Sequence, residues 1–588
     1  MHQTGKRLSF LQWRDQITRV SLKEDAKAGL TGALITIPQV IAYALIAGMP
    51  AEYGLYTAIT VTVFAALLGS SWHLVTGPAA AISMVVLSLA RDITPTGTES
   101  YLTTVFTLTL MMGFIQCGFG LLRLGALLNF ISHTVVVGFT SGAAVLIALS
   151  QVPKVLGIDK SSDQTYGQYL VFVFEHLKSI DGVSVAIAGV TILVSIIFKR
   201  WGKPVPHLIA GLAIGSGLAY LLTIFTDQPV EFLGDLPSGF LHLTIDQINP
   251  DLMGQLLPGA FALALLGLIE AVSIARSLSV KSHQLIDGNQ EFIAQGLANA
   301  GGSLLSGFAS SGSFTRSAAN YDAGAKTPMA QVFMALILVL TLLLFPSVTR
   351  YLSNASVAGS LIFIAYNLFN INELKRTFNT NFHERVILIA TSLSAIFLEL
   401  TFAIYIGVFL SLAFYLQRTS RPSIMTVAPI SHLPKRPIRN AVRYQVPECP
   451  QIKMIRIDGS LFFGSLDHIQ QHLRALYSAL PVPPKVIIIG KGINFIDASG
   501  AQMLEEEIQR YQRKGGRLIV TSLKGTVLDE LAELKSFRAP LSDWFCETPE
   551  AAIEALVPET APLLCATCDK RIFNECQTRP KPSNTHLC

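Results

Sequence analysis

Residues 77–90 of the chain read GPAAAISMVVLSLA. This apolar stretch opens on Gly77-Pro78 and is too short to cross a bilayer alone, because a membrane-spanning helix needs about 20 residues. A second short stretch, residues 313–323, follows Gly312. Matching interrupted segments in two halves of a chain indicate a transporter built from repeats, with its substrate near the middle of the membrane. These two stretches therefore decide the fold that we expect.

The composition places most of the chain in a lipid bilayer. Of its 588 residues, 51% are hydrophobic and only 14% are charged, and the mean hydropathy is +0.49. Soluble proteins carry about 25% charged residues, so an ordinary soluble enzyme is excluded and we expect no enzymatic activity. The net charge of +5 is small for this length and does not favour a nucleic-acid partner.

Twelve apolar stretches of spanning length accompany the two short ones. They lie near residues 26–48, 51–70, 101–123, 130–151, 182–199, 205–226, 254–277, 290–308, 327–349, 354–371, 384–399 and 401–417. The short pieces are then third and tenth of fourteen segments, so each is the third element of a half of seven. The spacing predicts a polytopic α-helical membrane protein with 7+7 inverted repeats.

Basic residues predict the orientation. Six of them precede the first span: Lys6, Arg7, Arg14, Arg19, Lys23 and Lys27. Basic flanks stay in the cytoplasm, and an even number of segments returns the chain there at the basic residues 418–443. We expect a multi-pass protein of the inner or plasma membrane with both termini cytoplasmic. No apolar core followed by a small-residue cleavage site occurs near the start, so no removable signal peptide is expected.

The segment after residue 420 has a different character. Prolines mark residues 421–445 as a linker, and strand and helix patterns then alternate, which is typical of a small α/β domain. The predicted organisation has five parts: a cytoplasmic N-terminus (1–25), a transmembrane domain (26–420), the linker (421–445), the α/β domain (446–557) and a cysteine-containing tail (558–588).

Several sequence motifs resemble those of one transporter family. They are residues 38–44 (PQVIAYA), 47–50 (AGMP), 53–56 (YGLY), 76–78 (TGP), 132–139 (SHTVVVGF), 289–291 (NQE), 296–299 (GLAN) and 312–317 (GSFTRS). Together they resemble the sulfate permease (SulP) family of anion transporters. Residues 496–500 (IDASG) resemble the STAS domain, which is shared with anti-sigma-factor antagonists.

The resemblance implies that the segments form two domains. A core domain would comprise segments 1–4 and 8–11, and a gate domain segments 5–7 and 12–14. The core would move against the gate in an elevator-like manner. The family also implies a homodimer. A cytoplasmic protein could dock on the STAS domain.

The start of the first short helix suits an anion. A helix N-terminus offers unpaired N–H groups and about half a positive charge. Pro78 fits the first helical turn, where its missing N–H costs nothing. Gly77, Ala79 and Ala80 leave space beside the backbone donors. An alternative is that these small residues only permit close helix packing.

The second short helix adds side-chain donors. Gly312 opens it, and the hydroxyls of Ser313 and Thr315 follow. The family resemblance places anion contacts at the positions Ala79, Phe314, Thr315, Arg316, Gln39 and Tyr43. Arg316 could add positive potential at membrane depth, or it could lie near the interface. We predict no metal or organic cofactor at this site.

Glu270 is the candidate for energy coupling. It lies in the apolar run 265–272, where loss of hydration favours a protonated carboxyl group. A bound proton would lower the charge that must move with a divalent anion. Sodium is the other candidate ion, but Ile274 stands where family members resembling the sodium-bicarbonate branch have a hydroxyl. A structural Glu270–arginine pair or an exchange mechanism also remains open.

The functional hypotheses follow from these residues. The first is proton-coupled secondary transport of an oxyanion such as sulfate. Sodium-coupled bicarbonate uptake, passive chloride or anion exchange, and an anion sensor signalling through the STAS domain are alternatives. No phosphate-binding loop of the Gly-x-x-x-x-Gly-Lys-Ser/Thr type occurs, which disfavours an ATP-driven pump.

Two features of the soluble part remain open. Ser499 is the hydroxyl left at the turn that is phosphorylated in antagonist STAS domains, but an Asp/Ser helix cap is the favoured interpretation. In the tail, Cys565, Cys568, Cys576, Cys588 and His586 could begin a zinc site. Their irregular spacing favours free thiols instead.

Overall fold

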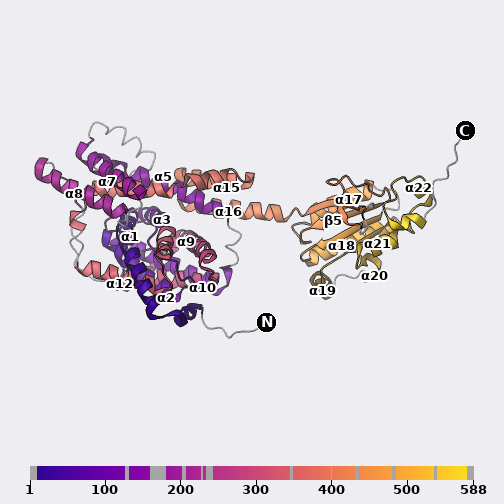
Figure 1. Ribbon diagram of the computed structural model, residues 1–588, viewed down its shortest axis with the longest axis horizontal. Coiled ribbons are helices and arrows are strands. Elements are labelled where there is room, and N and C mark those ends of the chain that lie inside the picture. The colour runs from indigo at the N-terminus through magenta and orange to yellow at the C-terminus, as the bar shows by residue number, and fades with distance from the viewer. Residues whose placement is uncertain are drawn as a thin grey trace. The chain divides into compact units, whose positions relative to one another are not determined.

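The computed structural model describes residues 9–125, 132–158, 180–201, 207–226, 230–232, 243–344, 349–398, 400–430, 433, 436–479, 485–534 and 540–578. The chain divides into two compact units, Met1–Leu412 and Ala413–Cys588 (Figure 1). The first is helical and the second is built on a sheet.

The helices of the first unit follow the predicted segments closely. They are α1 (Arg19–Ile46), α2 (Ala51–Leu68), α3 (Ala80–Arg91), α4 (Glu99–Leu121), α5 (His133–Leu156), α7 (Gly182–Trp201), α8 (His207–Thr226), α9 (Met253–Ser282), α10 (Gly288–Ser303), α11 (Phe314–Asp322), α12 (Met329–Leu344), α13 (Asn354–Leu368), α14 (Ile371–Phe378), α15 (Phe382–Phe397) and α16 (Leu400–Thr419). Short 3₁₀ turns lie at Ser9–Gln16, Ile245–Gln247, Pro250–Leu252 and Thr349–Tyr351. Within the described residues, nine helices are long and apolar enough to cross a membrane.

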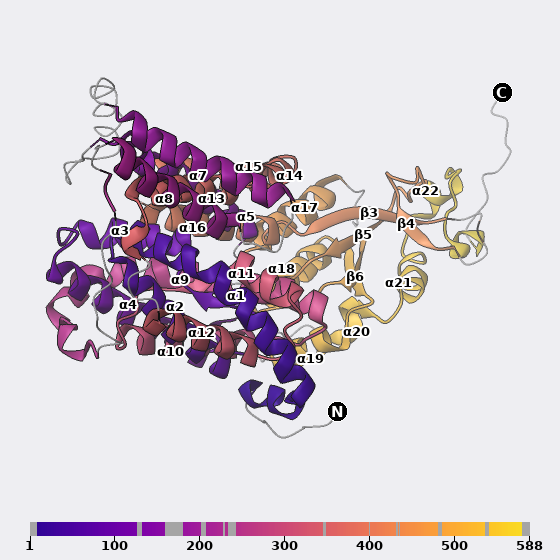
Figure 2. The same cartoon turned by 60° about the vertical axis from the view of Figure 1, so that its left-hand side comes forward.

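These helices pack as two groups. Helices α1–α4 and α9–α12 contact one another extensively and are called the core group here. Helices α5, α7, α8 and α13–α16 form the gate group, in which α5 packs on α13 and α15. In Figure 2 the gate group lies above the core group. The core group corresponds to the predicted segments 1–4 and 8–11, and the gate group to segments 5–7 and 12–14. The predicted polytopic helical fold is therefore confirmed. The inverted symmetry of the halves stays a prediction.

One helix boundary and one additional helix differ from the prediction. Helix α1 begins at Arg19 rather than near residue 26, because Thr18 caps it: the Thr18 hydroxyl accepts from the Ser21 N–H at 3.0 Å, and the Ser21 hydroxyl oxygen accepts from the Thr18 N–H at 2.8 Å. The segment 1–25 therefore contains the first turns of α1. The short helix α14 was not predicted, since its polar composition gives it no spanning signal.

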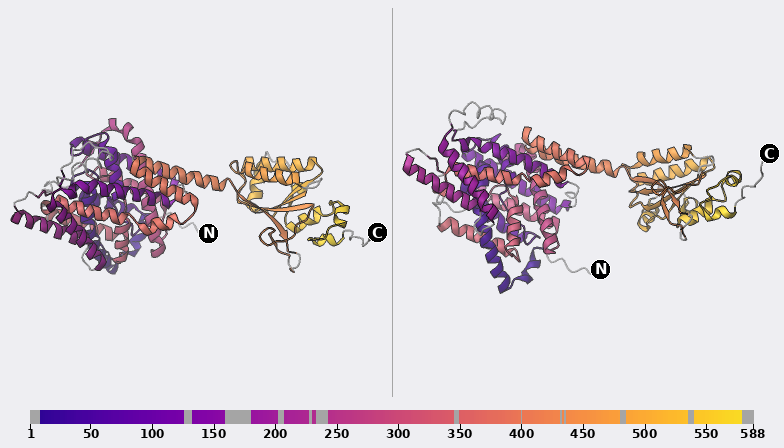
Figure 3. Two further views of the ribbon diagram at one scale, coloured as in Figure 1. Left: turned by 90° about the horizontal axis from the view of Figure 1, so that it is seen from above. Right: turned by 45° about the horizontal axis from the view of Figure 1, so that its top comes forward.

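The second unit contains a six-stranded sheet in the order β4-β3-β5-β6-β7-β8. Its strands are β3 (Ser423–Pro429), β4 (Ile438–Asn440), β5 (Ile452–Asp458), β6 (Lys485–Gly492), β7 (Arg517–Thr521) and β8 (Phe545–Cys546). Strands β5 to β8 are parallel, and β3 is antiparallel to both of its neighbours. The helices are α17 (Leu466–Ala479), α18 (Ala498–Arg513), α19 (Gly525–Glu533), α20 (Leu541–Trp544), α21 (Pro549–Leu556) and α22 (Pro562–Ala566), followed by a 3₁₀ turn at Asn574–Thr578. Figure 3 shows helices beside this sheet.

The segment predicted as a linker belongs to the sheet. Residues 421–445 contain β3 and β4, and Val427 is buried in the second unit. The prolines that suggested a linker lie at strand ends: Pro422 precedes β3 and Pro429 ends it. Proline is tolerated there because no ladder hydrogen bond is lost. The tail is also packed, since Ile572 and Phe573 are buried in the same apolar cluster as β5.

Candidate functional site

The two interrupted segments meet in a small ribbon. Strand β1 (Thr76–Gly77) pairs antiparallel with β2 (Ser311–Gly312), with Thr76 opposite Gly312 and Gly77 opposite Ser311. Helix α3 begins three residues after β1, and α11 begins two residues after β2. The ribbon therefore holds two helix N-termini close together, although they come from opposite halves of the membrane unit.

Arg316 connects the two helix starts. Its side chain is only 2% exposed, and its guanidinium donates a hydrogen bond of 2.6 Å to the carbonyl oxygen of Pro78. A Cβ at Gly77 would lie 3.2 Å from one guanidinium nitrogen, so glycine makes room for the arginine. The Nε atom of Arg316 has no hydrogen-bond partner within the described residues. Arg316 is thus buried within the core group, and its depth in the membrane stays a prediction.

The start of α3 is open to an acceptor. Ala79 is the N-cap residue in an extended conformation, and no side chain caps the helix among the described residues. Ala80 is the first helical residue, so Pro78 lies just before the helix and not in its first turn as predicted. Both alanines are buried. The first N–H groups of a helix have no partner within the helix. The backbone after Pro78 therefore offers donors that an anion can use.

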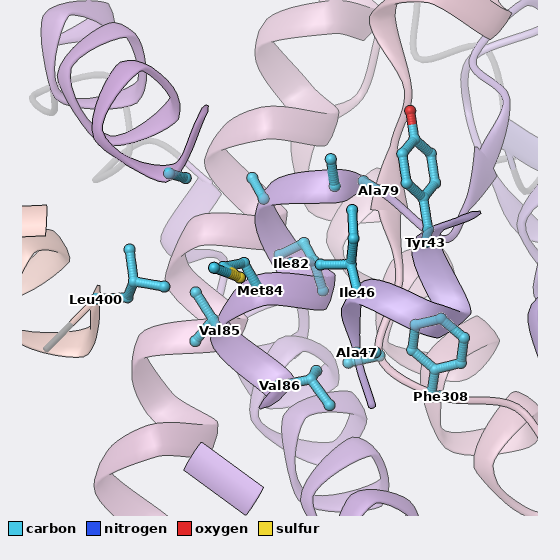
Figure 4. Close-up of a cluster of buried hydrophobic side chains, with 14 of the residues drawn as sticks. Tyr43, Ile46, Ala47, Ala79, Ile82, Met84, Val85, Val86, Phe308 and Leu400 are labelled. Atoms are coloured by element: carbon cyan, nitrogen blue, oxygen red, sulfur yellow. The ribbon is translucent and has the colours of Figure 1, made fainter. Parts of the chain in front are cut away.

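One side chain of α1, that of Tyr43, lies at the start of α3. Tyr43 and Ala79 belong to one buried cluster, and in Figure 4 the Tyr43 ring stands beside Ala79 with its hydroxyl pointing away from Ile46 and Ile82. Gln39 lies one turn earlier on α1 and is 4% exposed. Its Oε1 atom accepts no hydrogen bond within the described part of the chain. The structure thus gathers Tyr43 with the α3 start.

The start of α11 is arranged differently. Ser313 is its N-cap, and the Ser313 hydroxyl accepts from the N–H of Arg316 at 3.5 Å. That oxygen therefore caps its own helix, while its proton remains available to donate. Phe314 is 58% exposed and Thr315 is also exposed. These two side chains are therefore not packed into the ribbon.

Glu270 approaches the ribbon from α9. Gly312 packs against α9 so closely that a Cβ there would lie 3.0 Å from Cα of Ala271. The Ser311 hydroxyl donates to the carbonyl oxygen of Gly267 at 2.9 Å and lies beside the half-buried Glu270 carboxyl group. Glu270 and Arg316 interact electrostatically. The candidate coupling acid and the candidate anion site are therefore neighbours.

A polar ladder on α10 supports the ribbon, and the sequence analysis did not identify it as such. Glu291, Gln295 and Asn299 are four residues apart and fully or nearly fully buried. The Gln295 amide donates to the Thr76 hydroxyl at 2.8 Å. Asn299 accepts from the Ser310 N–H at 2.8 Å and donates to the Ser310 carbonyl at 3.1 Å. Polar residues at helical spacing in an otherwise apolar segment were the available signal.

At the other end of this ladder, Glu291 holds the turn before β1. Its carboxylate accepts from the backbone N–H groups of Ser70 and Ser71 at 3.0 and 3.2 Å and from the Ser70 hydroxyl at 3.1 Å. One helix of the second half thus positions the approach to the first half-helix.

The candidate regulatory serine belongs to the second unit. Ser499 is exposed in the first turn of α18. Asp497 is the N-cap: its carboxylate accepts from the Gly500 N–H at 2.7 Å and from the Phe463 N–H at 3.0 Å. The capping interpretation of this turn is confirmed for Asp497, whereas a regulatory role of Ser499 stays a prediction.

Comparison with known proteins gives matches over both units. The model of the family described as "Sulfate permease family" matches residues 22–391, and that of the STAS domain matches residues 443–552. "Probable sulfate transporter 4.2" of Arabidopsis thaliana is 27% identical over 585 residues, covering 94% of this chain and 85% of the relative. "Sulfate transporter 1.1" of the same plant is 29% identical over 550 residues, covering 89% of this chain and 84% of the relative.

Solved structures share the fold. The murine Solute Carrier 26 family member A9 anion transporter in the inward-facing state superposes with a TM-score of 0.85 at 19% identity, covering 94% of this chain and 96% of the other. The transmembrane domain of a cyanobacterium bicarbonate transporter, BicA, gives a TM-score of 0.61 at 23% identity, covering 66% of this chain and 98% of the other.

Proposed function

Because this chain belongs to the sulfate permease family and carries a STAS domain, we propose that it is a secondary transporter of sulfate or a related small oxyanion in the cell membrane. The observation that carries the proposal is the hydrogen bond from Arg316 to Pro78, which places a buried cation at the meeting point of two helix N-termini. A site of this kind recognises negative charge through the backbone and one side chain.

Charge favours a divalent anion. Each helix N-terminus contributes roughly +0.5 and the arginine adds a full charge, which together come to about +2. The helices that form the site also carry buried polar atoms without a hydrogen-bond partner in the described residues, among them Gln39 Oε1 on α1, Ser83 Oγ on α3 and Arg316 Nε on α11. Buried polar atoms are normally hydrogen-bonded. A bound oxyanion would supply acceptors for the two donors.

The same charge count makes Glu270 a plausible coupling group. When ionised it removes about one positive charge from the neighbourhood of Arg316, and when protonated it restores it. Binding of a proton to Glu270 would therefore favour binding of the divalent anion. We propose that Glu270 carries the coupling proton. Sodium coupling is disfavoured because Ile274, one turn further along α9, offers no oxygen ligand.

We further propose that the site moves with the core group. The residues assigned to it lie on α1, α3, α9, α11 and the ribbon, all within that group. A displacement of the core group against the gate group would carry the bound anion without dismantling its contacts. This is an elevator-like form of alternating access.

The test is uptake into proteoliposomes that contain the purified protein. Radiolabelled sulfate, chloride and bicarbonate are each offered under an inward proton gradient, an inward sodium gradient or no gradient. The proposal expects sulfate to accumulate above equilibrium only with the proton gradient. Accumulation driven by sodium would favour bicarbonate-type uptake, and equilibration without accumulation would favour exchange or conduction. Sulfate binding with no flux in any condition would identify a sensor and refute the transport proposal.

A further inference from the structure

Four cysteines of the second unit line a single cavity. Cys565, Cys568 and Cys576 come from the tail, and Cys449 comes from the loop just before β5. All four are half-buried, and none of them forms a disulfide within the described residues. The tail and the β5 loop are far apart in sequence, so the fold rather than the sequence spacing gathers these thiols.

The two segments are fixed to each other by contacts that do not involve sulfur. The Gln451 side chain accepts from the Ala561 N–H at 2.8 Å and donates to the Ala561 carbonyl at 3.4 Å. Ile572 and Phe573 are buried against the sheet, and the Arg436 guanidinium donates to the Ile572 carbonyl at 3.4 Å. The tail is therefore held beside Cys449 by ordinary packing and hydrogen bonds.

Hydrogen-bond donors and positive charge surround the sulfur atoms. The Gln451 amide donates to Cys565 Sγ at 3.3 Å, and the Thr560 hydroxyl lies 3.3 Å from the same sulfur. Lys570 and Arg571 line the cavity with the thiols. Hydrogen-bond donors that do not themselves bind the metal orient and stabilise the thiolates that do. Four thiolates around a divalent cation carry a net charge of −2, which these two basic residues would offset.

We propose that Cys449, Cys565, Cys568 and Cys576 bind one zinc ion that fastens the tail to the STAS sheet. Structural zinc prefers four thiolates in a tetrahedron at about 2.3 Å, and a Cys-x-x-Cys pair supplies two of them. No three ligating side chains of the described residues are yet arranged around one point, so the thiols rotate toward a shared centre when the ion binds. This ligand set replaces the pair Cys588 and His586, which lies outside the described residues.

Metal content of the full-length protein tests the site. Protein purified in detergent with a reductant and Zn²⁺, and then freed of unbound metal, is analysed by mass spectrometry for zinc. About one zinc per chain is expected. The variants Cys449→Ser and Cys568→Ser should each lose it. Cys546→Ser is the matched control, because Cys546 lies on β8 and does not line the cavity.

A cobalt measurement keeps the test informative if a serine variant fails to fold. Wild-type protein loaded with Co²⁺ should show the strong visible absorption and the sulfur-to-metal charge transfer of a tetrahedral thiolate centre. Three outcomes would overturn the proposal. The first is wild-type protein that takes up no zinc, and the second is a folded Cys449→Ser variant that keeps one zinc per chain. The third is a disulfide between two of the four cysteines, found by peptide mapping of protein prepared without reductant. Since none of these readouts depends on transport, failure here is distinguishable from failure of the proposed function.

Discussion

The guanidinium of Arg316 lies 2.6 Å from the carbonyl oxygen of Pro78. The two residues are 238 positions apart in the chain: Pro78 lies just before α3, and Arg316 lies in the first turn of α11. The positive charge of Arg316, on α11, therefore lies at the start of α3. This contact makes the two starts one site, and four predictions follow from it and its supports.

Replacing Arg316 should weaken anion binding more than it weakens folding. Loss of a charged hydrogen-bonding partner costs about 1.5–3 kcal/mol, which corresponds to roughly 10- to 150-fold weaker binding. We expect Arg316→Ala to raise the KM of sulfate uptake by this factor, and Arg316→Lys to rescue only part of it. Arg200→Ala, at an exposed arginine that ends α7, is the control. A normal KM in Arg316→Ala would show that Arg316 does not contribute to anion binding.

A methyl group at Gly77 should displace the arginine. The added Cβ would lie 3.2 and 3.4 Å from the two terminal guanidinium nitrogens of Arg316. We expect Gly77→Ala to reduce sulfate affinity severalfold. Gly118→Ala in α4 is the matched control, because its Cβ meets no atom within 4 Å and alanine favours a helix by about 0.5–1 kcal/mol. Equal effects of the two variants in uptake assays would show that Arg316 does not need the space at Gly77.

Neutralising Glu270 should separate coupling from binding. We expect Glu270→Gln to keep sulfate counterflow while losing accumulation driven by a proton gradient, because the amide cannot exchange a proton. Wild-type uptake should rise as the external pH falls, and uptake by the variant should be flat over the same range. Glu52→Gln, at another buried acid of the core group, should behave like the wild type. Full pH dependence in Glu270→Gln would assign the coupling elsewhere.

Removing the α10 amide at Asn299 should destabilise the ribbon. The variant Asn299→Ala leaves the buried N–H and carbonyl of Ser310 without their partner, which costs about 1–3 kcal/mol per unsatisfied group. We expect a lower melting temperature in detergent together with reduced uptake. Asn379→Ala, at the exposed end of α14, should change neither. A melting temperature unchanged in Asn299→Ala would mean that the ladder is not structural.

The membrane fold could be predicted well from the sequence because long apolar runs leave few alternatives. Most helices begin within a few residues of their predicted spans, and the two short pieces were found because Gly77-Pro78 and Gly312 interrupt the apolar pattern. The soluble part was harder, since prolines at the ends of β3 resemble linker prolines. The burial of Val427 shows that this segment belongs to the sheet. Tertiary packing of this kind cannot be read from the local sequence.

The site was predicted residue by residue but not as a set of contacts. That Arg316 binds the Pro78 carbonyl, and that Gly77 makes space for it, depends on a pairing between distant segments. The sequence likewise could not identify the fourth ligand of the proposed zinc site, because Cys449 precedes β5 while the other three cysteines follow α21. Sequence shows which residue types are present, whereas only the fold shows which of them meet.

The β1–β2 ribbon also has a consequence for biosynthesis. Strand β1 leaves the ribosome long before β2, with helices α3 to α10 made in between. Closing so long a loop is a non-local and therefore slow event. Until β2 has been made, the backbone of β1 and the start of α3 lack their partner strand. The proposed anion site is thus among the last parts of the molecule to be completed.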